Sequence, residues 1–273
     1  MEKTGEIRFA RNSFSKRLKS MLSVDFRRMF TTPLFYIMVG IAVVIPILVL
    51  VMTTTVGSST SVDPVTGVET TVEMEPITNT WQVVESISGE SSGMSADIMS
   101  MCNINLLFFM AAVFVCIFIA DDFRSGYAKN LFTVRSPKAD YVISKSLAGF
   151  TGGVFMILAY FIGALLGGAI AGLSFDVGAA GSGGIVMCLL SKMCLMGVFV
   201  PIYVLMSVLG KQKLWLSMIC SLGVGMLFFM IVPALTPLNS TMINVIMCLA
   251  GGAGFSIGLG AISNAVLKKT NLV

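Results

Sequence analysis

Residues 34–56 read LFYIMVGIAVVIPILVLVMTTTV, a run of twenty-three residues with no charged side chain. The hydrocarbon core of a bilayer is about 30 Å thick, and a helix needs about 20 mostly apolar residues to cross it. This run therefore predicts a transmembrane helix. The whole chain agrees, because 56% of its 273 residues are hydrophobic and only 12% are charged. Soluble domains contain about 25% charged residues, so this chain has too few to cover a water-exposed surface.

Six segments of the chain are apolar and long enough to cross a bilayer as helices. They are residues 34–56, 104–120, 146–173, 184–209, 214–235 and 242–267. We therefore expect an all-α, polytopic membrane protein. Its six-helix transmembrane domain would occupy residues 34–273, after an N-terminal segment of residues 1–33.

The basic residues are distributed unevenly among the segments that connect these spans. Seventeen of the 18 lysines and arginines lie before the first span, between the second and third, between the fourth and fifth, or after the sixth. The other connections contain no basic residue, and two of them, 57–103 and 174–183, contain acidic residues. Basic loops of membrane proteins face the cytoplasm. We therefore expect both termini and the loop 121–145 to be cytoplasmic, and the loop 57–101 to be external.

The segment before the first span has the pattern of an amphipathic helix. Apolar residues recur at helical spacing, basic residues face away from them, and Thr31-Thr32-Pro33 ends the helix. The apolar set is Phe14, Leu18, Met21, Leu22, Met29 and Phe30, and the basic set is Lys16, Arg17, Lys19, Arg27 and Arg28. This pattern favours a helix lying on the cytoplasmic leaflet, with its basic face toward anionic headgroups. A basic tail that only satisfies the orientation rule is the alternative.

Several kinds of chemistry are excluded by what the sequence lacks. Without any histidine, the chain cannot form a His-based catalytic triad or the usual zinc sites, and it has no Gly-rich loop of the Gly-x-x-x-x-Gly-Lys-Ser/Thr type. All six cysteines lie in or beside apolar runs, as small buried hydrophobes do. We expect no catalytic residue, metal site or cofactor in this chain. No span contains a pair of carboxylates, which disfavours an ion-coupled carrier.

Lys192 is the one charged residue inside a predicted span. An intramembrane charge is a candidate for a substrate pathway. Alternatively, its long side chain extends to the outer interface and has no functional role. Glycine pairs four residues apart, such as Gly163 and Gly167, favour close packing of helices.

The loop between the second and third spans is the most distinctive polar segment. It reads DDFRSGYAKNL over residues 121–131 and continues through Arg135, Ser136 and Pro137 to Tyr141 and Lys145. A short helix here, acidic at its start and basic later, agrees with the helix dipole and offers a polar face to a soluble partner. An ordinary solvated loop is the alternative.

This loop resembles that of the type-2 ATP-binding-cassette permeases, the membrane subunits of bacterial exporters. The matching residues are Asp121, Asp122, Gly126, Tyr127, Lys129, Asn130, Leu131, Arg135, Tyr141, Ser144 and Lys145. Asp25-Phe26-Arg27-Arg28-Met29-Phe30 resembles the family's opening, and the six-span layout covers the whole chain. Members usually have Glu where this chain has Asp121-Asp122. Their re-entrant segment before the last span would be reduced here to residues 233–240.

The resemblance implies a permease subunit in the plasma membrane, without enzymatic activity of its own. Its partners would be an ATPase subunit that binds ATP and Mg²⁺, a second permease subunit, identical or related, and membrane lipid, with no nucleic acid. The ATPase-coupling residues would be Asp121, Asp122, Phe123, Arg124, Gly126, Tyr127, Lys129, Asn130, Leu131 and Arg135. A secondary carrier or channel without an ATPase, and an accessory membrane sensor or anchor, are the alternatives.

Overall fold

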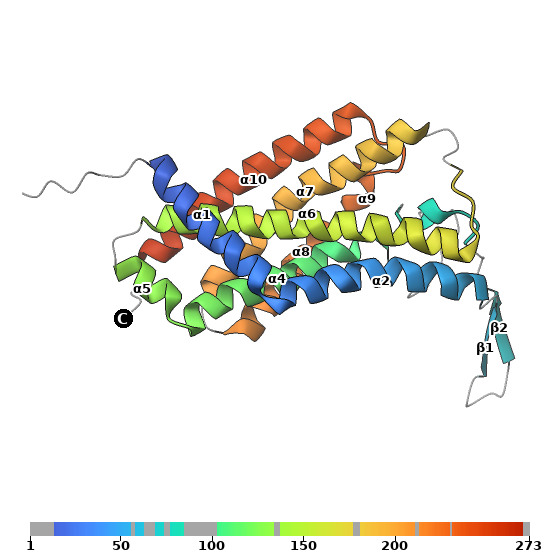
Figure 1. Cartoon of the computed structure of the whole chain (residues 1–273), viewed down its shortest axis with the longest axis horizontal. Helices are drawn as coiled ribbons and strands as arrows, with labels where there is room; N and C mark the ends of the chain where they lie inside the picture. Colours follow the sequence, from blue (N-terminus) through green and yellow to red (C-terminus); the bar gives the residue numbers. More distant parts are fainter. Residues whose placement is uncertain are drawn as a thin grey trace, which may run out of the picture.

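The computed structural model describes most of the chain as a bundle of long helices (Figure 1). The described residues are 14–55, 58–62, 69–73, 77–84, 103–133, 137–176, 181–210, 213–229 and 231–269. The helices are α1 (Phe14–Thr31), α2 (Pro33–Thr55), α4 (Leu106–Arg124), α5 (Tyr127–Thr133), α6 (Lys138–Ala171), α7 (Gly181–Gly210), α8 (Leu214–Phe229), α9 (Val232–Leu235) and α10 (Met242–Lys269). A hairpin of β1 (Ser58–Val62) and β2 (Glu69–Glu73), and a short 3₁₀ helix (Thr80–Val83), lie in the segment expected to be external, most of which is outside the described residues.

Within the described part of the chain, five helices are long and apolar enough to cross a membrane: α2, α4, α6, α7 and α10. The prediction of a helical, membrane-embedded protein is therefore confirmed. The expected fifth span, 214–235, differs from the prediction. It consists of α8, which has 16 residues, and the separate four-residue α9. At 1.5 Å per residue, α8 is about 24 Å long, which is less than the thickness of the hydrocarbon core.

A proline explains why this fifth segment is interrupted. Pro233 lies in the first turn of α9, where its missing amide proton costs nothing. Four residues earlier is Phe229, the last residue of α8. A continuous helix would bring the Pro233 ring against the Phe229 carbonyl and would lose that hydrogen bond. The segment 214–235 is therefore not one continuous helix, and its crossing of the membrane stays a prediction.

Glycines allow two helix pairs to approach closely. A Cβ atom added at Gly167 of α6 would lie 2.9 Å from the Cα of Ile47 in α2, and one at Gly163 would collide with the Val43 carbonyl. Between α7 and α10, a Cβ at Gly197 would lie 3.4 Å from the Cα of Gly252. The packing role predicted for the glycine pair 163/167 is therefore confirmed.

The predicted amphipathic helix is present as α1, and Thr32 separates it from α2. Its buried residues include Met21 and Met29, which belong to the apolar set, and the helix packs against α6. Of the other expected interfacial residues, Leu18 and Leu22 are half-buried, whereas Phe14 and Arg27 are exposed. Its placement on a lipid surface remains a prediction.

The segment expected to be the loop 121–145 is mostly helical. α4 continues to Arg124, and α5 follows after a two-residue turn. α6 already begins at Lys138, eight residues before the predicted start of the third span at residue 146. With 34 residues, α6 is about 51 Å long, so it extends beyond a hydrocarbon core about 30 Å thick. Its first two turns are therefore free to carry polar residues.

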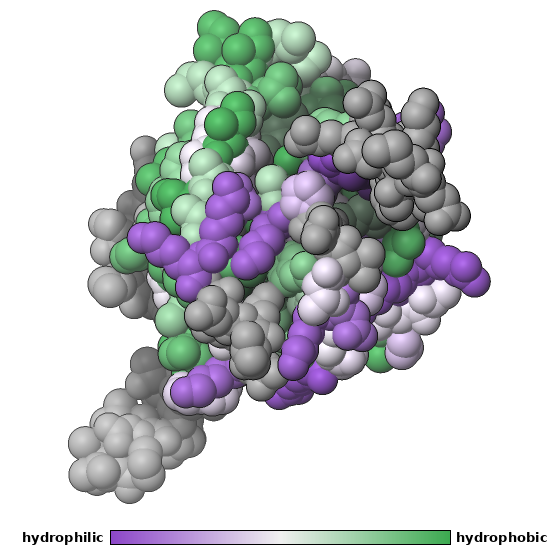
Figure 2. Space-filling model, turned by 90° about the vertical axis from the view of Figure 1, so that its left-hand side faces the viewer, coloured by the Kyte–Doolittle hydropathy of each residue, from purple (hydrophilic) through white to green (hydrophobic). Residues whose placement is uncertain are grey.

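Basic residues gather at one end of the bundle. α1, α5, the start of α6 and the end of α10 lie together there, and hydrophilic side chains spread across this face (Figures 1 and 2). We call it the lysine-rich end. The opposite end holds the 3₁₀ helix, the start of α4 and the end of α6, where the Trp81 indole donates a hydrogen bond to the Phe175 carbonyl at 3.2 Å.

Candidate functional site

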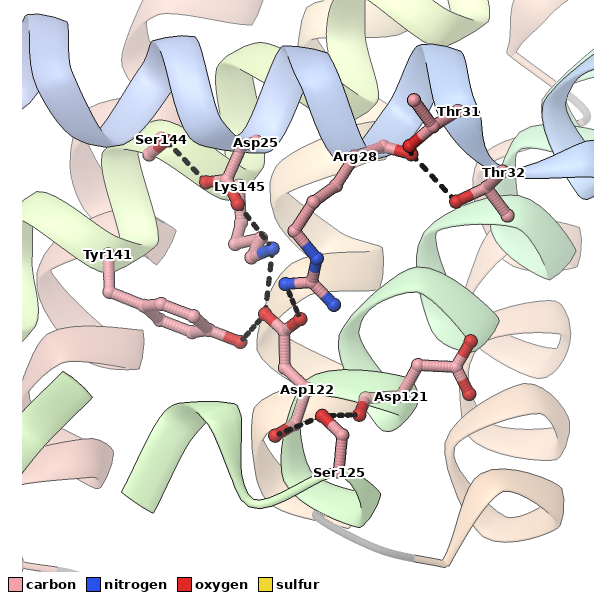
Figure 3. Close-up of polar contacts among 10 residues, drawn as sticks. All are labelled: Asp25, Arg28, Thr31, Thr32, Asp121, Asp122, Ser125, Tyr141, Ser144 and Lys145. Carbon is pink, nitrogen blue, oxygen red and sulfur yellow. Dashed lines mark hydrogen bonds and ion pairs between the residues drawn. The ribbon is translucent and has the colours of Figure 1, made fainter. Parts of the chain in front are cut away.

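Three helices meet at the lysine-rich end around a group of polar side chains (Figure 3). This group, which we call the ion-pair cluster, comprises Asp25 and Arg28 of α1, Asp122 of α4, and Tyr141, Ser144 and Lys145 of α6. Only Arg28 among them is partly exposed. Arg28 of α1 and Asp122 of α4 are 94 residues apart in the sequence.

Asp122 is the centre of the ion-pair cluster, and its side chain is 0% exposed. One carboxylate oxygen accepts a hydrogen bond from Nη1 of Arg28. The other lies 2.7 Å from Nζ of Lys145 and accepts a hydrogen bond of 2.9 Å from the hydroxyl of Tyr141. Asp122 therefore joins α1, α4 and α6 at one point.

Asp25 holds the same lysine from the side of α1. Its Oδ1 accepts a hydrogen bond of 2.7 Å from Nζ of Lys145, and its Oδ2 accepts one from the hydroxyl of Ser144. Lys145 thus lies between two buried carboxylates. Two carboxylates and two cations balance, so the cluster has no net charge.

Aromatic rings cover the two cations. The guanidinium carbon of Arg28 lies 4.5 Å from the ring centroid of Tyr127, and Nζ of Lys145 lies 4.0 Å from that of Phe118. Such contacts stabilise a cation by electrostatic attraction to the ring face. Burial and the nearby Asp25 carboxylate raise the pKa of the Tyr127 phenol above its ordinary value. Tyr127 is therefore neutral at physiological pH.

The ion-pair cluster also explains one of the two aspartates at the end of α4, Asp122. Carboxylates in the last turn of a helix oppose the negative end of the helix dipole, and the cations from α1 and α6 compensate this for Asp122. The Ser125 hydroxyl donates a hydrogen bond of 2.6 Å to the Asp121 carbonyl. Gly126, with φ of 74°, then turns the chain into α5. Residues with a Cβ rarely adopt this conformation.

The residues expected to contact an ATPase divide into two groups in the structure. Asp121, Arg124, Lys129 and Asn130 are exposed, whereas Asp122, Phe123, Gly126, Tyr127 and Leu131 are buried or half-buried. Arg135 lies outside the described residues. In Figure 3 the side chain of Asp121 points away from the ion-pair cluster. Only the exposed group is available to a partner without rearrangement.

Two residues are placed differently from the sequence interpretation. Asp122 was expected among the ATPase-coupling residues, but its carboxylate is buried against Arg28 and Lys145 and is not exposed for direct contact with a partner. Arg28 does not face away from the apolar side of α1, because it reaches the same carboxylate. Helical periodicity assigns a residue to one side of its helix, but a long arginine side chain extends past that boundary to a buried partner.

Asp25, Tyr141, Ser144 and Lys145 entered the sequence interpretation only through the family resemblance, without a role of their own. Of these, Asp25 could have been singled out from its position on α1. It lies four residues from both Met21 and Met29, so it occupies the buried face of α1. A carboxylate on an apolar helix face requires a partner there, and this pattern was the available signal. A second link between the same helices joins Arg17 of α1 to the buried Asp140 of α6 at 3.1 Å.

Lys192 lies toward the opposite end of the bundle and is 1% exposed. Its Nζ donates hydrogen bonds of 3.0 Å to Oδ1 of Asn105, just before α4, and of 2.9 Å to Oγ1 of Thr236, just after α9. The hypothesis that this side chain extends to the outer interface is therefore wrong. Lys192 connects α7 with the segments at the start of α4 and the end of α9.

Comparisons with known proteins identify no relative from which a role for these residues could be transferred. No family model, no curated protein and no solved structure matches the chain.

Proposed function

We propose that this chain is the transmembrane subunit of an ATP-binding-cassette exporter in the plasma membrane. It would act with a separate ATPase subunit and a second permease subunit, with six spans and both termini in the cytoplasm. The resemblance of residues 121–145 to the type-2 permeases is the first support for this proposal. The second is the arrangement of that segment, which is helical, polar on one side and fixed to α1 and α6 on the other.

The observation that carries the proposal is the division of this segment into an exposed and a buried side. A partner that displaces the exposed residues Arg124 or Lys129 would also move Asp122, which is on the same α4–α5 unit. Because Asp122 is joined to Arg28 and Lys145, that displacement would reach α1 and α6. Interfaces and packed elements change between discrete arrangements rather than deforming continuously. The ion-pair cluster would thus transmit ATPase motion to two transmembrane helices.

The test is copurification of the full-length chain from native membranes, followed by an ATP hydrolysis assay. We expect an ATPase subunit to copurify with the parent chain, and to be lost when Arg124→Glu and Lys129→Glu are combined. Exposed Lys19 on α1 provides the matched control, because Lys19→Glu changes a charge at the same end of the molecule but outside α5. ATP hydrolysis by the isolated chain, or a carrier activity without any ATPase, would contradict the proposal.

A further inference from the structure

A groove lies between α6, α7 and α10 in the half of the bundle nearer the lysine-rich end. Its volume is about 310 Å³. Leu147 and Phe150 of α6, Gly197 and Pro201 of α7, and Gly252 and Ser256 of α10 are among its lining residues. Leu147 is 40% exposed, and so the groove opens to the side of the bundle, where lipid surrounds a membrane protein.

The floor of the groove is backbone and its walls are hydrocarbon. Gly197 and Gly252 bring the backbones of α7 and α10 close together at this floor, where an added Cβ at Gly252 would lie 3.0 Å from the Cys194 carbonyl oxygen. The hydroxyl of Ser256 donates a hydrogen bond of 3.2 Å to the Gly197 carbonyl, so this polar group is already satisfied. Among the residues that the structure describes, none that lines the groove is charged. Such a surface favours an apolar occupant over a polar solute.

Polar groups follow at the end of the groove nearer the lysine-rich end. Ser263 and Asn264 lie three and four residues after Gly260, so they continue the same face of α10. Ser263 Oγ and Asn264 Oδ1 are buried and have no hydrogen-bond partner among the described residues. α10 then ends with Lys268 and Lys269, both exposed. Along α10, the apolar lining of the groove is thus followed by polar groups and then by positive charge.

We propose that this groove holds one acyl chain of an anionic phospholipid, with the headgroup at the Lys268–Lys269 end of α10. Basic pockets between transmembrane helices on the cytoplasmic side bind anionic headgroups. The groove volume of about 310 Å³ lies at the lower end of the range of about 300–1,000 Å³ for pockets that hold drug-sized molecules, which suits one acyl chain rather than a whole phospholipid. α10 is accessible to lipid, because only 11% of its apolar 18-residue stretch is buried inside the protein. The corresponding share for α4 is 67%. The inference requires membrane embedding but not the transport function proposed above.

The test is native mass spectrometry of the full-length chain in detergent, incubated with phosphatidylglycerol or phosphatidylcholine. We expect the parent to retain phosphatidylglycerol preferentially. Gly260→Leu fills the groove and should abolish retention of both lipids. Gly258→Leu is the matched control, since neither position has an atom within 4 Å of an added Cβ but Gly258 does not line the groove.

The headgroup is tested separately, with substitutions at exposed positions that cannot disturb packing. Lys268→Gln combined with Lys269→Gln should reduce the preference for phosphatidylglycerol by about fivefold per lysine and leave phosphatidylcholine retention unchanged. Lys213→Gln, at another exposed lysine outside the groove, should have no effect. Equal retention of both lipids by the parent, or retention unchanged by Gly260→Leu, would overturn the proposal. So would conversion of a lipid-free dimer to a monomer by Gly260→Leu, which would make a second copy the occupant.

Discussion

The two ends of the bundle each bury a lysine, but they hold it differently. At the lysine-rich end, Lys145 lies between the carboxylates of Asp25 and Asp122. Toward the opposite end, Lys192 donates to the neutral oxygens of Asn105 and Thr236. Removal of Lys145 would leave two buried carboxylates with one cation, Arg28, whereas Asn105 and Thr236 are neutral with or without Lys192. The burial of a charged side chain therefore does not by itself predict how much its substitution destabilises the protein. The charge of its hydrogen-bond partners decides the size of the effect.

The largest effect is expected for Asp122→Asn. It leaves Arg28 and Lys145 with Asp25 as the one remaining carboxylate of the cluster. Removing one member of a buried ion pair costs about 3–5 kcal/mol, so membrane abundance and the melting temperature of the purified chain should fall sharply. The matched control is Asp121→Asn, which is exposed and should change stability by less than about 0.5 kcal/mol. Equal effects of the two substitutions would remove the basis for the ion-pair cluster.

A direct comparison of the two lysines comes next. Lys145→Met leaves two buried carboxylates facing Arg28, and should destabilise the chain by about 3–5 kcal/mol. Lys192→Met leaves two neutral oxygens without this donor, which costs about 1–3 kcal/mol. Thermal unfolding of both variants in the same detergent measures the difference. If Lys192→Met is the more damaging, the comparison between the ends is reversed, and loss of transport with normal assembly would place Lys192 in a substrate pathway.

Gly126 tests the turn between α4 and α5. Its φ of 74° strains other residues by about 1–2 kcal/mol, although no atom lies within 4 Å of an added Cβ. Backbone strain, and not a steric clash, is therefore the reason for a glycine at this position. Gly126→Val should weaken ATPase copurification, while Gly126→Asn should not, because Asn tolerates this conformation.

Tyr127→Ala should act similarly to Gly126→Val, because it removes the ring beneath Arg28 at the edge of the ion-pair cluster. A cation–π contact at a partly exposed site is worth about 0.5–1 kcal/mol, so the chain should still fold and insert. The measurement is retention of the ATPase, with membrane abundance checked first. Tyr127→Phe keeps the ring and is the control. Normal retention in the Ala variant would show that this contact does not contribute to coupling.

The smallest effect on the structure is expected from two Ser→Cys substitutions at exposed positions. Labelling of these cysteines tests which end of the bundle faces the cytoplasm. Ser125 at the lysine-rich end and Ser174 at the opposite end are both exposed. Each is replaced by Cys in a cysteine-free background and treated with an impermeant thiol reagent on intact cells. We expect labelling at position 174 and not at 125. The reverse pattern would invert the orientation inferred from the basic residues.

The sequence determined the class of protein, the existence of α1 and the ends of several spans. These follow from properties that are local to each segment. Twenty apolar residues in a row cannot be solvated, and their backbone groups must bond within a helix. The break at Thr32 was predictable because Pro33 disfavours helical geometry at the preceding residue. The interruption before Pro233 has a comparable cause, but the apolar run that continues through it concealed the signal.

Only the tertiary structure decided the partners of the buried charges. Asp25, Asp122 and Lys145 belong to helices that are distant in sequence, and hydropathy treats each as an isolated polar residue. Helical periodicity assigned Arg28 to the face toward headgroups, and the outer interface was one of two alternatives for Lys192. Both side chains instead reach oxygen acceptors inside the bundle. Which of these outcomes occurs depends on whether folding brings an acceptor within about 3 Å. That distance is a property of helix packing, and one-dimensional patterns carry no information about it.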